Sequence, residues 1–128
     1  MRFGAAMHDG VIYVMGGLTF DGGPFLNTTL MYNVALKTWS YGPEMMEGRS
    51  DFCAAAADGK IFAVAGFTTG YATMKTVEVM DPSAATPAWA KAADLPQERG
   101  DCTCASSGGK VYAIGGALLI YVSFYSSA

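Results

Sequence analysis

The sequence predicts an all-β fold built from repeated, four-stranded antiparallel units. A short apolar stretch with strand-forming residues occurs three times, at residues 11–15, 60–64 and 111–114. Each copy follows a turn glycine and ends at a small residue and a glycine, and the turn glycines are 49 and 50 residues apart. Trp39 and Trp89 keep the same spacing, 50 residues. A constant period near fifty residues indicates a repeat architecture.

Size and composition set broad limits on the protein. The 128 residues suggest one domain, with 52% apolar and 15% charged residues. No apolar run reaches the roughly 18 residues that a membrane helix needs, and no secretory signal pattern is present. The net charge is −3, and the sequence contains no cluster of lysine and arginine residues, so we expect no nucleic-acid partner. Three cysteines without paired spacings favour a reducing compartment, and we expect a cytoplasmic location.

The first unit, residues 1–48, contains the clearest turn. Asp9 and Gly10 predict a two-residue type I′ hairpin turn between a strand at 3–7 and the strand at 11–15, because glycine tolerates positive φ. The second of these strands is apolar at every position, which predicts burial on both faces. A loop at 18–27 and strands at 28–33 and 37–41 complete the unit.

The second unit, residues 49–98, repeats this order. Its strands are expected at 51–57, 60–64, 76–80 and around Trp89, with a loop at 67–74. The third unit, residues 99–128, supplies strands at 102–106 and 111–114, and then the pattern is lost. Its uncharged apolar tail at 117–125 reads as a further strand. One meander of this size is too small to be stable alone, so the units must stack.

These features resemble the kelch repeat, the blade of a β-propeller. The resemblance covers residues 3–116 and rests on an ordered set: Arg49 and Arg99 at unit starts, the turn glycines with an aromatic residue three positions later, the double glycines 16–17 and 115–116, Tyr32, Glu78 with Asp81-Pro82, Trp39 and Trp89. It implies a kelch-type β-propeller fragment with four-stranded antiparallel blades. Four to eight blades usually close a propeller and this chain holds about two and a half, so the propeller is incomplete.

Several positions depart from the kelch pattern. Ala65 replaces a glycine, Met80 replaces the tyrosine, and Leu30 stands where the second unit has Glu78. The first unit also lacks the opening arginine, and Arg2 aligns instead with Asp51 and Asp101.

The repeated residues have structural interpretations. A residue without Cβ lets an aromatic ring lie flat against the backbone, and Trp39 and Trp89 are the expected packing partners of the glycines. We expect Arg49 to pair with an acid such as Glu78. Three explanations of the incomplete propeller stay open: a fragment of a longer chain, assembly with itself or another subunit, or capping by the tail at 117–128. A fragment, or a subunit covered by its neighbours, is favoured because the tail is a poor free edge.

The residues of this sequence give little support for a catalytic function. His8 is the only histidine, whereas a metal site needs about three ligands, and the copper oxidases that resemble kelch propellers use two histidines. Cys102 and Cys104 alternate along a strand and are interpreted as buried thiols. The serines have no identifiable base. We expect no catalysis, no metal and no cofactor.

Two short motifs are discounted. Asn27-Thr28-Thr29 is a glycosylation sequon, which matters only in a secreted chain. Arg99-Gly100-Asp101 spells an adhesion tripeptide, but the repeat alignment places it at a unit boundary.

The resemblance implies binding through one rim, formed by the loops between the second and third strands and by the unit starts. The expected partner-binding residues are Phe20, Asp21, Phe25, Ser50, Asp51, Phe67, Tyr71, Gly100 and Asp101. Exposed loop aromatics are typical contact residues, and two aspartates at the mouth favour a basic or hydroxyl-rich partner. The alternative is that the aromatics cover the glycines of their own loops.

The expected function is that of a non-catalytic protein-interaction module, a kelch-like scaffold or adaptor. Domains of this kind often serve as substrate adaptors in ubiquitin ligases, and that role enters here by analogy. Two alternatives stay open. The chain is a fragment of an oxidase- or epimerase-like propeller enzyme whose catalytic residues lie in missing blades, or it is a structural subunit of a larger assembly. In each case a homo-oligomer or a larger chain or complex is expected, because the propeller cannot close alone.

Overall fold

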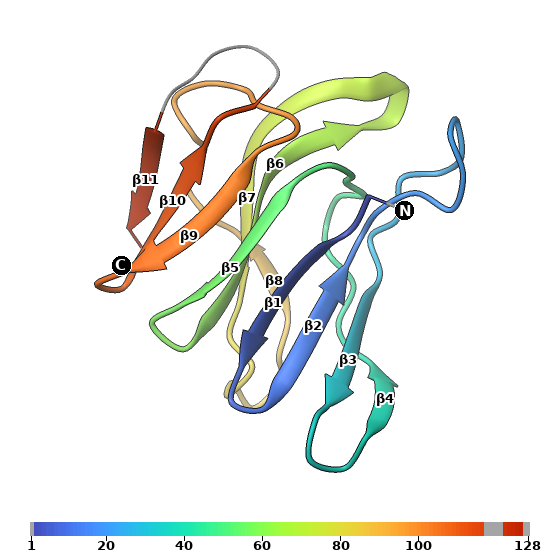
Figure 1. Ribbon diagram of the computed structural model, residues 1–128, viewed down its shortest axis with the longest axis vertical. Coiled ribbons are helices and arrows are strands. Elements are labelled where there is room, and N and C mark those ends of the chain that lie inside the picture. The colour runs from blue at the N-terminus through green and yellow to red at the C-terminus, as the bar shows by residue number, and fades with distance from the viewer. Residues whose placement is uncertain (1, 117–121, 127–128) are drawn as a thin grey trace.

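The computed structural model describes residues 2–116 and 122–126, and it places three antiparallel sheets side by side (Figure 1). Each sheet follows the chain in order or reversed order, as a meander does. Blade 1 contains β1 (Gly4–His8), β2 (Val11–Met15), β3 (Thr29–Asn33) and β4 (Thr38–Tyr41). Blade 2 contains β5 (Cys53–Ala57), β6 (Lys60–Thr68), β7 (Ala72–Met80) and β8 (Trp89–Lys91). Blade 3 contains β9 (Thr103–Ser107), β10 (Lys110–Ile114) and β11 (Val122–Ser126). The predicted all-β fold is confirmed, and the first two units are four-stranded antiparallel sheets as expected.

The predicted hairpin turn has the expected backbone. Asp9 and Gly10 have φ values of 47° and 73°, as a type I′ turn requires, and Asp58 and Gly59 repeat this with 51° and 71°. The strands on either side pair directly from the turn, with His8 opposite Val11. The turn chemistry therefore fixes the register of the inner hairpin in both blades.

The prediction of a loop at 67–74 is wrong. β6 continues to Thr68, a 3-10 turn spans Thr69–Tyr71, and β7 begins at Ala72. A β-bulge between Val64 and Gly66 lets the hairpin extend while shifting its register. The tail prediction is confirmed for Val122–Ser126, which pairs with β10, and residues 117–121 lie outside the described residues.

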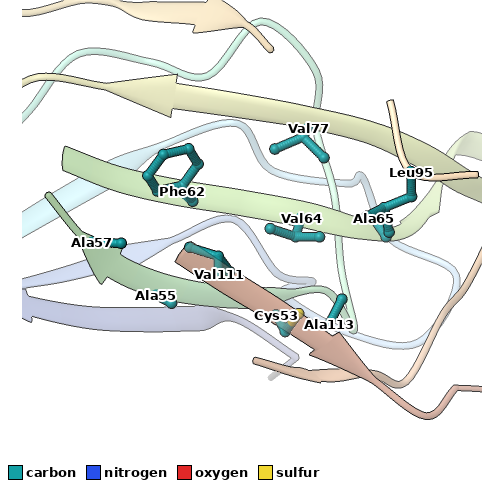
Figure 2. Packing of buried hydrophobic residues seen from close by; sticks show 10 residues of the cluster. All are labelled: Cys53, Ala55, Ala57, Phe62, Val64, Ala65, Val77, Leu95, Val111 and Ala113. Carbon is teal, nitrogen blue, oxygen red and sulfur yellow. The ribbon is translucent and has the colours of Figure 1, made fainter. Parts of the chain in front are cut away.

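The hydrophobic core lies between the blades. One cluster joins blade 1 to blade 2 through Tyr13, Met15, Ile61 and Ala63, among others. A second joins blade 2 to blade 3, where Val111 and Ala113 of β10 lie over β5 and β6 (Figure 2). Blade 2 has a neighbour on each side, so β6 is buried on both faces as its unbroken apolar run predicts. In β2 only one face is deeply buried, so the same prediction is wrong there.

The aromatic rings that cover glycines are phenylalanines instead of the expected tryptophans. The Phe52 ring lies against Gly4, where an added Cβ would come within 2.5 Å of it, and against Gly16. Trp89 is buried with 6% of its surface exposed, but Trp39 is 61% exposed and touches the ring of Tyr32. The expectation that both tryptophans pack in the core therefore holds for Trp89 alone.

The expected pairing of Arg49 with Glu78 is confirmed. Arg49 is fully buried, and its Nη2 donates to Glu78 Oε2 at 2.8 Å while its Nη1 donates to the carbonyl oxygen of Ala65. Glu78 also accepts hydrogen bonds from the backbone N–H groups of Met46 and Glu47. The segment that links blade 1 to blade 2 is thus fastened to β7 by one buried carboxylate.

The cysteine interpretation needs a correction. Cys104 forms a disulfide with Cys53, their Cα atoms 5.2 Å apart, so Cys104 is not a free thiol and the absence of disulfides assumed from the sequence is wrong. The bond ties β9 to the neighbouring β5. Cys102 is the free cysteine among the described residues, and burial raises the pKa of its thiol above the ordinary value.

Thiol counting tests the disulfide. Denatured without reductant, the chain is expected to take up one alkyl group, on Cys102, and after reduction three. Reduction is expected to lower the free energy of unfolding by about 2–4 kcal/mol, because the crosslink closes a loop of 51 residues in the unfolded chain. Intact-mass spectrometry and urea unfolding provide the measurements. Uptake of three alkyl groups without reductant would mean that the crosslink is absent.

Candidate partner-binding rim

The β2–β3 loop and the β6–β7 hairpin lie at the same edge of the molecule, the upper edge in Figure 1. Backbone hydrogen bonds close the base of the β2–β3 loop: Gly16 donates to Thr28 at 2.9 Å and Leu26 donates to Gly17 at 3.0 Å. The tip of the loop therefore projects from a fixed base. It carries Phe20, which is 65% exposed.

Three of the predicted aromatic residues form a cluster across the two loops. The ring of Tyr71 lies 5.3 Å from that of Phe25 and 6.3 Å from that of Phe67, both edge to face. The Tyr71 hydroxyl also accepts a hydrogen bond of 3.4 Å from the N–H of Gly22. Between the loops lies a hollow of about 430 Å³, lined by Gly22, Gly23, Pro24, Phe25, Thr69, Gly70 and Tyr71.

Two predicted residues lie beneath the surface of the rim. Ser50 is fully buried and exchanges two backbone hydrogen bonds with Phe67, at 2.9 and 2.8 Å. Gly100 is buried because the Phe67 ring occupies the space that a Cβ would need. In the chain as described, these two residues shape the rim. Gly100 belongs to the next unit start and not to the loop of Phe67, so this contact is not the one that the alternative expected. The Phe20 ring does lie against Gly23 of its own loop, as the alternative expected.

The three unit starts form a row of like positions. The N–H of Asp51 donates to the carbonyl of Arg2 at 3.0 Å, and the N–H of Asp101 donates to the carbonyl of Asp51 at 2.9 Å. The predicted alignment of Arg2 with the two aspartates thus corresponds to spatial adjacency. Asp101 is exposed at the end of this row.

Arg2 is a rim residue that the sequence reading did not place in the site. Its guanidinium lies 3.4 Å from Asp51 and 3.5 Å from Asp21, and the carboxylate of Asp51 raises the pKa of Arg2. With Asp101 at the end of the row, the aspartates outnumber this arginine and leave this part of the rim negatively charged. In the sequence, the alignment of Arg2 with Asp51 and Asp101 at the unit starts is the feature that could have placed it in the rim.

The other candidate sites offer less chemistry. A hollow of about 530 Å³ lies near the start of β2, and its lining includes Val11, Tyr13, Pro82 and Pro87. His8 lines a smaller hollow of about 200 Å³ beside Pro82 and Ser83. Within residues 2–116 and 122–126, no three His, Cys, Asp or Glu side chains gather as metal ligands would. In the same ranges, no helix has the length and apolar character of a membrane span.

The two discounted motifs are constrained by the fold. Arg99 is 3% exposed and donates to the carbonyl oxygen of Gly115, so the adhesion tripeptide cannot present its guanidinium at the surface. The Asn27 side chain donates to the carbonyl of Met45 at 3.2 Å, so the sequon amide is already engaged.

Comparison with known proteins identifies the repeat. The sequence model of the Kelch motif matches residues 1–46 and 48–96. Kelch-like protein 41a of Danio rerio is 38% identical over 66 residues, which are 52% of this chain and 11% of that protein. Kelch-like protein 8 of Mus musculus is 34% identical over 73 residues, 57% of this chain and 11% of that protein.

A plant relative extends the comparison. An F-box/kelch-repeat protein of Arabidopsis thaliana is 28% identical over 74 residues, 58% of this chain and 19% of that protein. The matched region thus spans between about a tenth and a fifth of these relatives. Two successive repeat matches, over most of the chain and over two blades of the expected topology, place this chain in the Kelch motif family.

Proposed function

We propose that this chain is a non-catalytic protein-interaction module that binds a protein segment through the rim. The observation that carries the proposal is the hollow between the β2–β3 loop and the β6–β7 hairpin, with Phe25 and Tyr71 in its wall and exposed Phe20 near the carboxylates. An aromatic hollow beside acidic groups suits an extended segment with an apolar anchor and a basic side chain. The names of the relatives, kelch-like and F-box/kelch-repeat, support a role as a scaffold or adaptor.

The charge of the rim favours a basic partner over an acidic one. Asp101 is the aspartate of the row that has no described ion pair, whereas Asp51 and Asp21 share Arg2. A lysine or arginine of the partner would gain most at Asp101, because Arg2 already offsets part of the charge at the other two. A hydroxyl-rich partner would use the same oxygens with a weaker dependence on salt.

Peptide selection tests the proposal. Short random peptides are selected on the immobilised full chain, and the enriched peptide is labelled and titrated by fluorescence polarisation. Phe20→Ala and Asp101→Lys are each expected to weaken its binding about tenfold, the usual effect of losing a significant interface contact. Added salt is expected to weaken the wild type and to leave Asp101→Lys nearly unchanged.

Matched controls come from the opposite edge of the molecule. Leu36 is 70% exposed in the β3–β4 turn, and Asp9 has φ 47° against 54° for Asp101. Leu36→Ala and Asp9→Lys should leave the peptide affinity unchanged. Selection that enriches no peptide, or a peptide indifferent to both rim variants, would refute rim binding.

A cytoplasmic location is retained as a proposal. The Cys53–Cys104 disulfide speaks against it, because disulfides persist mainly in oxidising compartments. Rapid acid quenching of cells followed by thiol alkylation would decide the matter, since a cytoplasmic chain is expected to have all three cysteines reduced.

A further inference from the structure

A hollow lies between blades 1 and 2, at the edge of the molecule opposite the rim. Each blade has a presenting face, turned toward the following blade, and in blades 2 and 3 the opposite, receiving face is covered by the preceding blade. The hollow lies where the presenting face of blade 1 meets the connection between β7 and β8, at the lower edge in Figure 1. Its described lining residues lie between positions 11 and 87, away from both ends of the chain.

Two cross-strand rows of blade 1 form the floor of the hollow. Tyr13, Met31 and Ser40 are directly opposite one another in β2, β3 and β4, and Val11 is opposite Asn33. Residues opposite each other, and residues two apart along a strand, share a face of the sheet. Both rows therefore face blade 2, and all five side chains line the hollow.

The wall of the hollow comes from blade 2 and from the linker between the blades. Pro43 lies in that linker, Met80 ends β7, and Pro82 and Pro87 lie in the connection between β7 and β8. Because a proline ring fixes φ, these prolines hold the wall in one shape. The volume of about 530 Å³ is within the range of small-molecule sites, and none of the described residues that line the hollow is charged.

The hydroxyl group of Tyr13 is the feature that points to a ligand. Tyr13 is 4% exposed, and no described residue is hydrogen-bonded to its hydroxyl. A buried tyrosine hydroxyl normally has a partner, because removing it from water without one is costly. Phe62 occupies the same place in blade 2, so packing of the blades requires only the ring. The hydroxyl is thus left over from packing and lies where a ligand atom can reach it.

The polar groups of the floor are hydrogen-bond donors. Burial, and then the carboxylate of Asp9, raise the pKa of Tyr13, so its hydroxyl stays protonated at neutral pH. Asn33 accepts a hydrogen bond of 3.0 Å from the N–H of Leu36 through its Oδ1. This bond uses the side-chain oxygen and leaves the amide nitrogen to donate. A ligand that satisfies both groups therefore carries an acceptor oxygen.

The neighbouring charge selects against anions. A smaller hollow of about 200 Å³ shares Val11, Tyr13 and Pro82 with the larger one and is also lined by His8 and Asp9. Asp9 has no ion pair among the described residues. Its carboxylate repels a negative charge placed in either hollow.

We propose that the hollow between blades 1 and 2 binds an uncharged small molecule with an apolar ring body and a carbonyl oxygen. The ring lies against Met31 and the proline wall, and the oxygen accepts from Tyr13 and Asn33. This site is separate from the rim, so it does not depend on the proposed protein-binding function.

A pair of fluorescent naphthalenes tests the site on the full chain. Prodan is uncharged and carries a ketone oxygen, whereas anilinonaphthalene sulfonate has the same ring system and a negative charge. Prodan is expected to bind saturably, with a blue-shifted emission, and at least tenfold more tightly than the sulfonate. Asp9→Asn is expected to strengthen binding of the sulfonate and to leave the prodan affinity within about twofold, since asparagine tolerates the positive φ of 47° at this position.

Two variants of the floor locate the probe. Tyr13→Phe is expected to weaken prodan binding about tenfold through the lost hydrogen bond, and Ser40→Phe is expected to abolish it by filling the hollow. The matched controls are Tyr32→Phe, on the other face of blade 1, and Ala90→Phe, at the place in blade 2 that Ser40 has in blade 1. Both controls should bind prodan as the wild type does, and far-ultraviolet circular dichroism checks that every variant is folded.

Three results would overturn the proposal. The first is a wild type that shows no saturable prodan binding. The second is equal affinity for the two probes, because the site would then not discriminate against a negative charge. The third is prodan binding that survives Tyr13→Phe and Ser40→Phe but is lost in Trp39→Ala, which would place the probe on the exposed face of blade 1.

Discussion

Replacing Trp89 by alanine is expected to lower the free energy of unfolding by about 3–5 kcal/mol, whereas Trp39→Ala is expected to change it by less than about 0.5 kcal/mol. The two tryptophans occupy the same place in successive blades, since Trp89 is opposite Met80 and Trp39 is opposite Tyr32. The two tryptophans differ only in the residues that surround them. Trp89 is buried between blades 1 and 2, and its indole N–H lies 3.1 Å from Thr29 Oγ1 and 3.0 Å from the carbonyl oxygen of Pro43.

Trp89→Phe separates packing from hydrogen bonding in this prediction. It keeps most of the buried ring but removes the donor, and leaving the acceptors unpaired is expected to cost about 1–3 kcal/mol of the total. Urea unfolding followed by circular dichroism measures all three variants, and the far-ultraviolet spectrum checks that each is folded. Equal losses for Trp39→Ala and Trp89→Ala would contradict the described packing of blade 2 on blade 1.

Removing either partner of the Arg49–Glu78 pair is expected to lower the free energy of unfolding by about 3–5 kcal/mol. Both side chains are almost completely inaccessible, so Arg49→Met leaves a buried carboxylate and Glu78→Leu leaves a buried guanidinium without its counter-charge. The double variant Arg49→Met/Glu78→Leu is expected to lose less than the sum of the two single losses. The coupling between the two positions should be about 1–3 kcal/mol, measured by urea unfolding of all four proteins.

The double variant is not expected to regain full stability. Glu78 also accepts from the N–H groups of Met46 and Glu47, at 2.6 and 3.3 Å, and a leucine side chain in its place would leave both without this acceptor. Lys91→Met, on the partly exposed Lys91–Asp94 pair, is a control in which little change is expected. Strictly additive losses at positions 49 and 78 would show that the arginine and the carboxylate act independently, and the pairing would then contribute no stability of its own.

The contact between blades 1 and 2 links the two predictions. Trp89 and the Arg49–Glu78 pair stabilise an interface that the chain makes internally, whereas Trp39 and Leu30 occupy the matching places on a face that no described residue covers.

Much of the rim could be predicted from the sequence, and part of it could not. The repeat alignment correctly brought the loop aromatics to one edge, because equivalent loops of stacked blades lie together. It could not foresee that Tyr71 contacts both Phe25 and Phe67, which depends on β6 and β7 extending as a hairpin to the 3-10 turn at Thr69–Tyr71. Nor could it assign Arg2 to the site, because that requires the approach of Asp21 from a different loop.

The Cys53–Cys104 disulfide illustrates the same limit. Two cysteines one period apart would occupy like places on successive blades and point in the same direction. A separation of 51, one more than the period, puts Cys53 on the presenting face of blade 2 and Cys104 on the receiving face of blade 3, so that they meet. The separation of the two cysteines can be read from the sequence, but it predicts a disulfide only once the order and orientation of the blades are known.

By itself, the sequence determined the period, the strand positions around each Asp-Gly or Gly-Gly turn, and the pairing of Arg49 with Glu78, since these depend on local conformational preference and on the repetition of one unit. The tertiary structure alone decided which faces are covered. Trp39 and Trp89 are the same residue at the same place in the repeat, yet one is 61% and the other 6% exposed. The physical reason is that burial of a sheet face depends on a neighbouring sheet, which no property of the strand itself can specify.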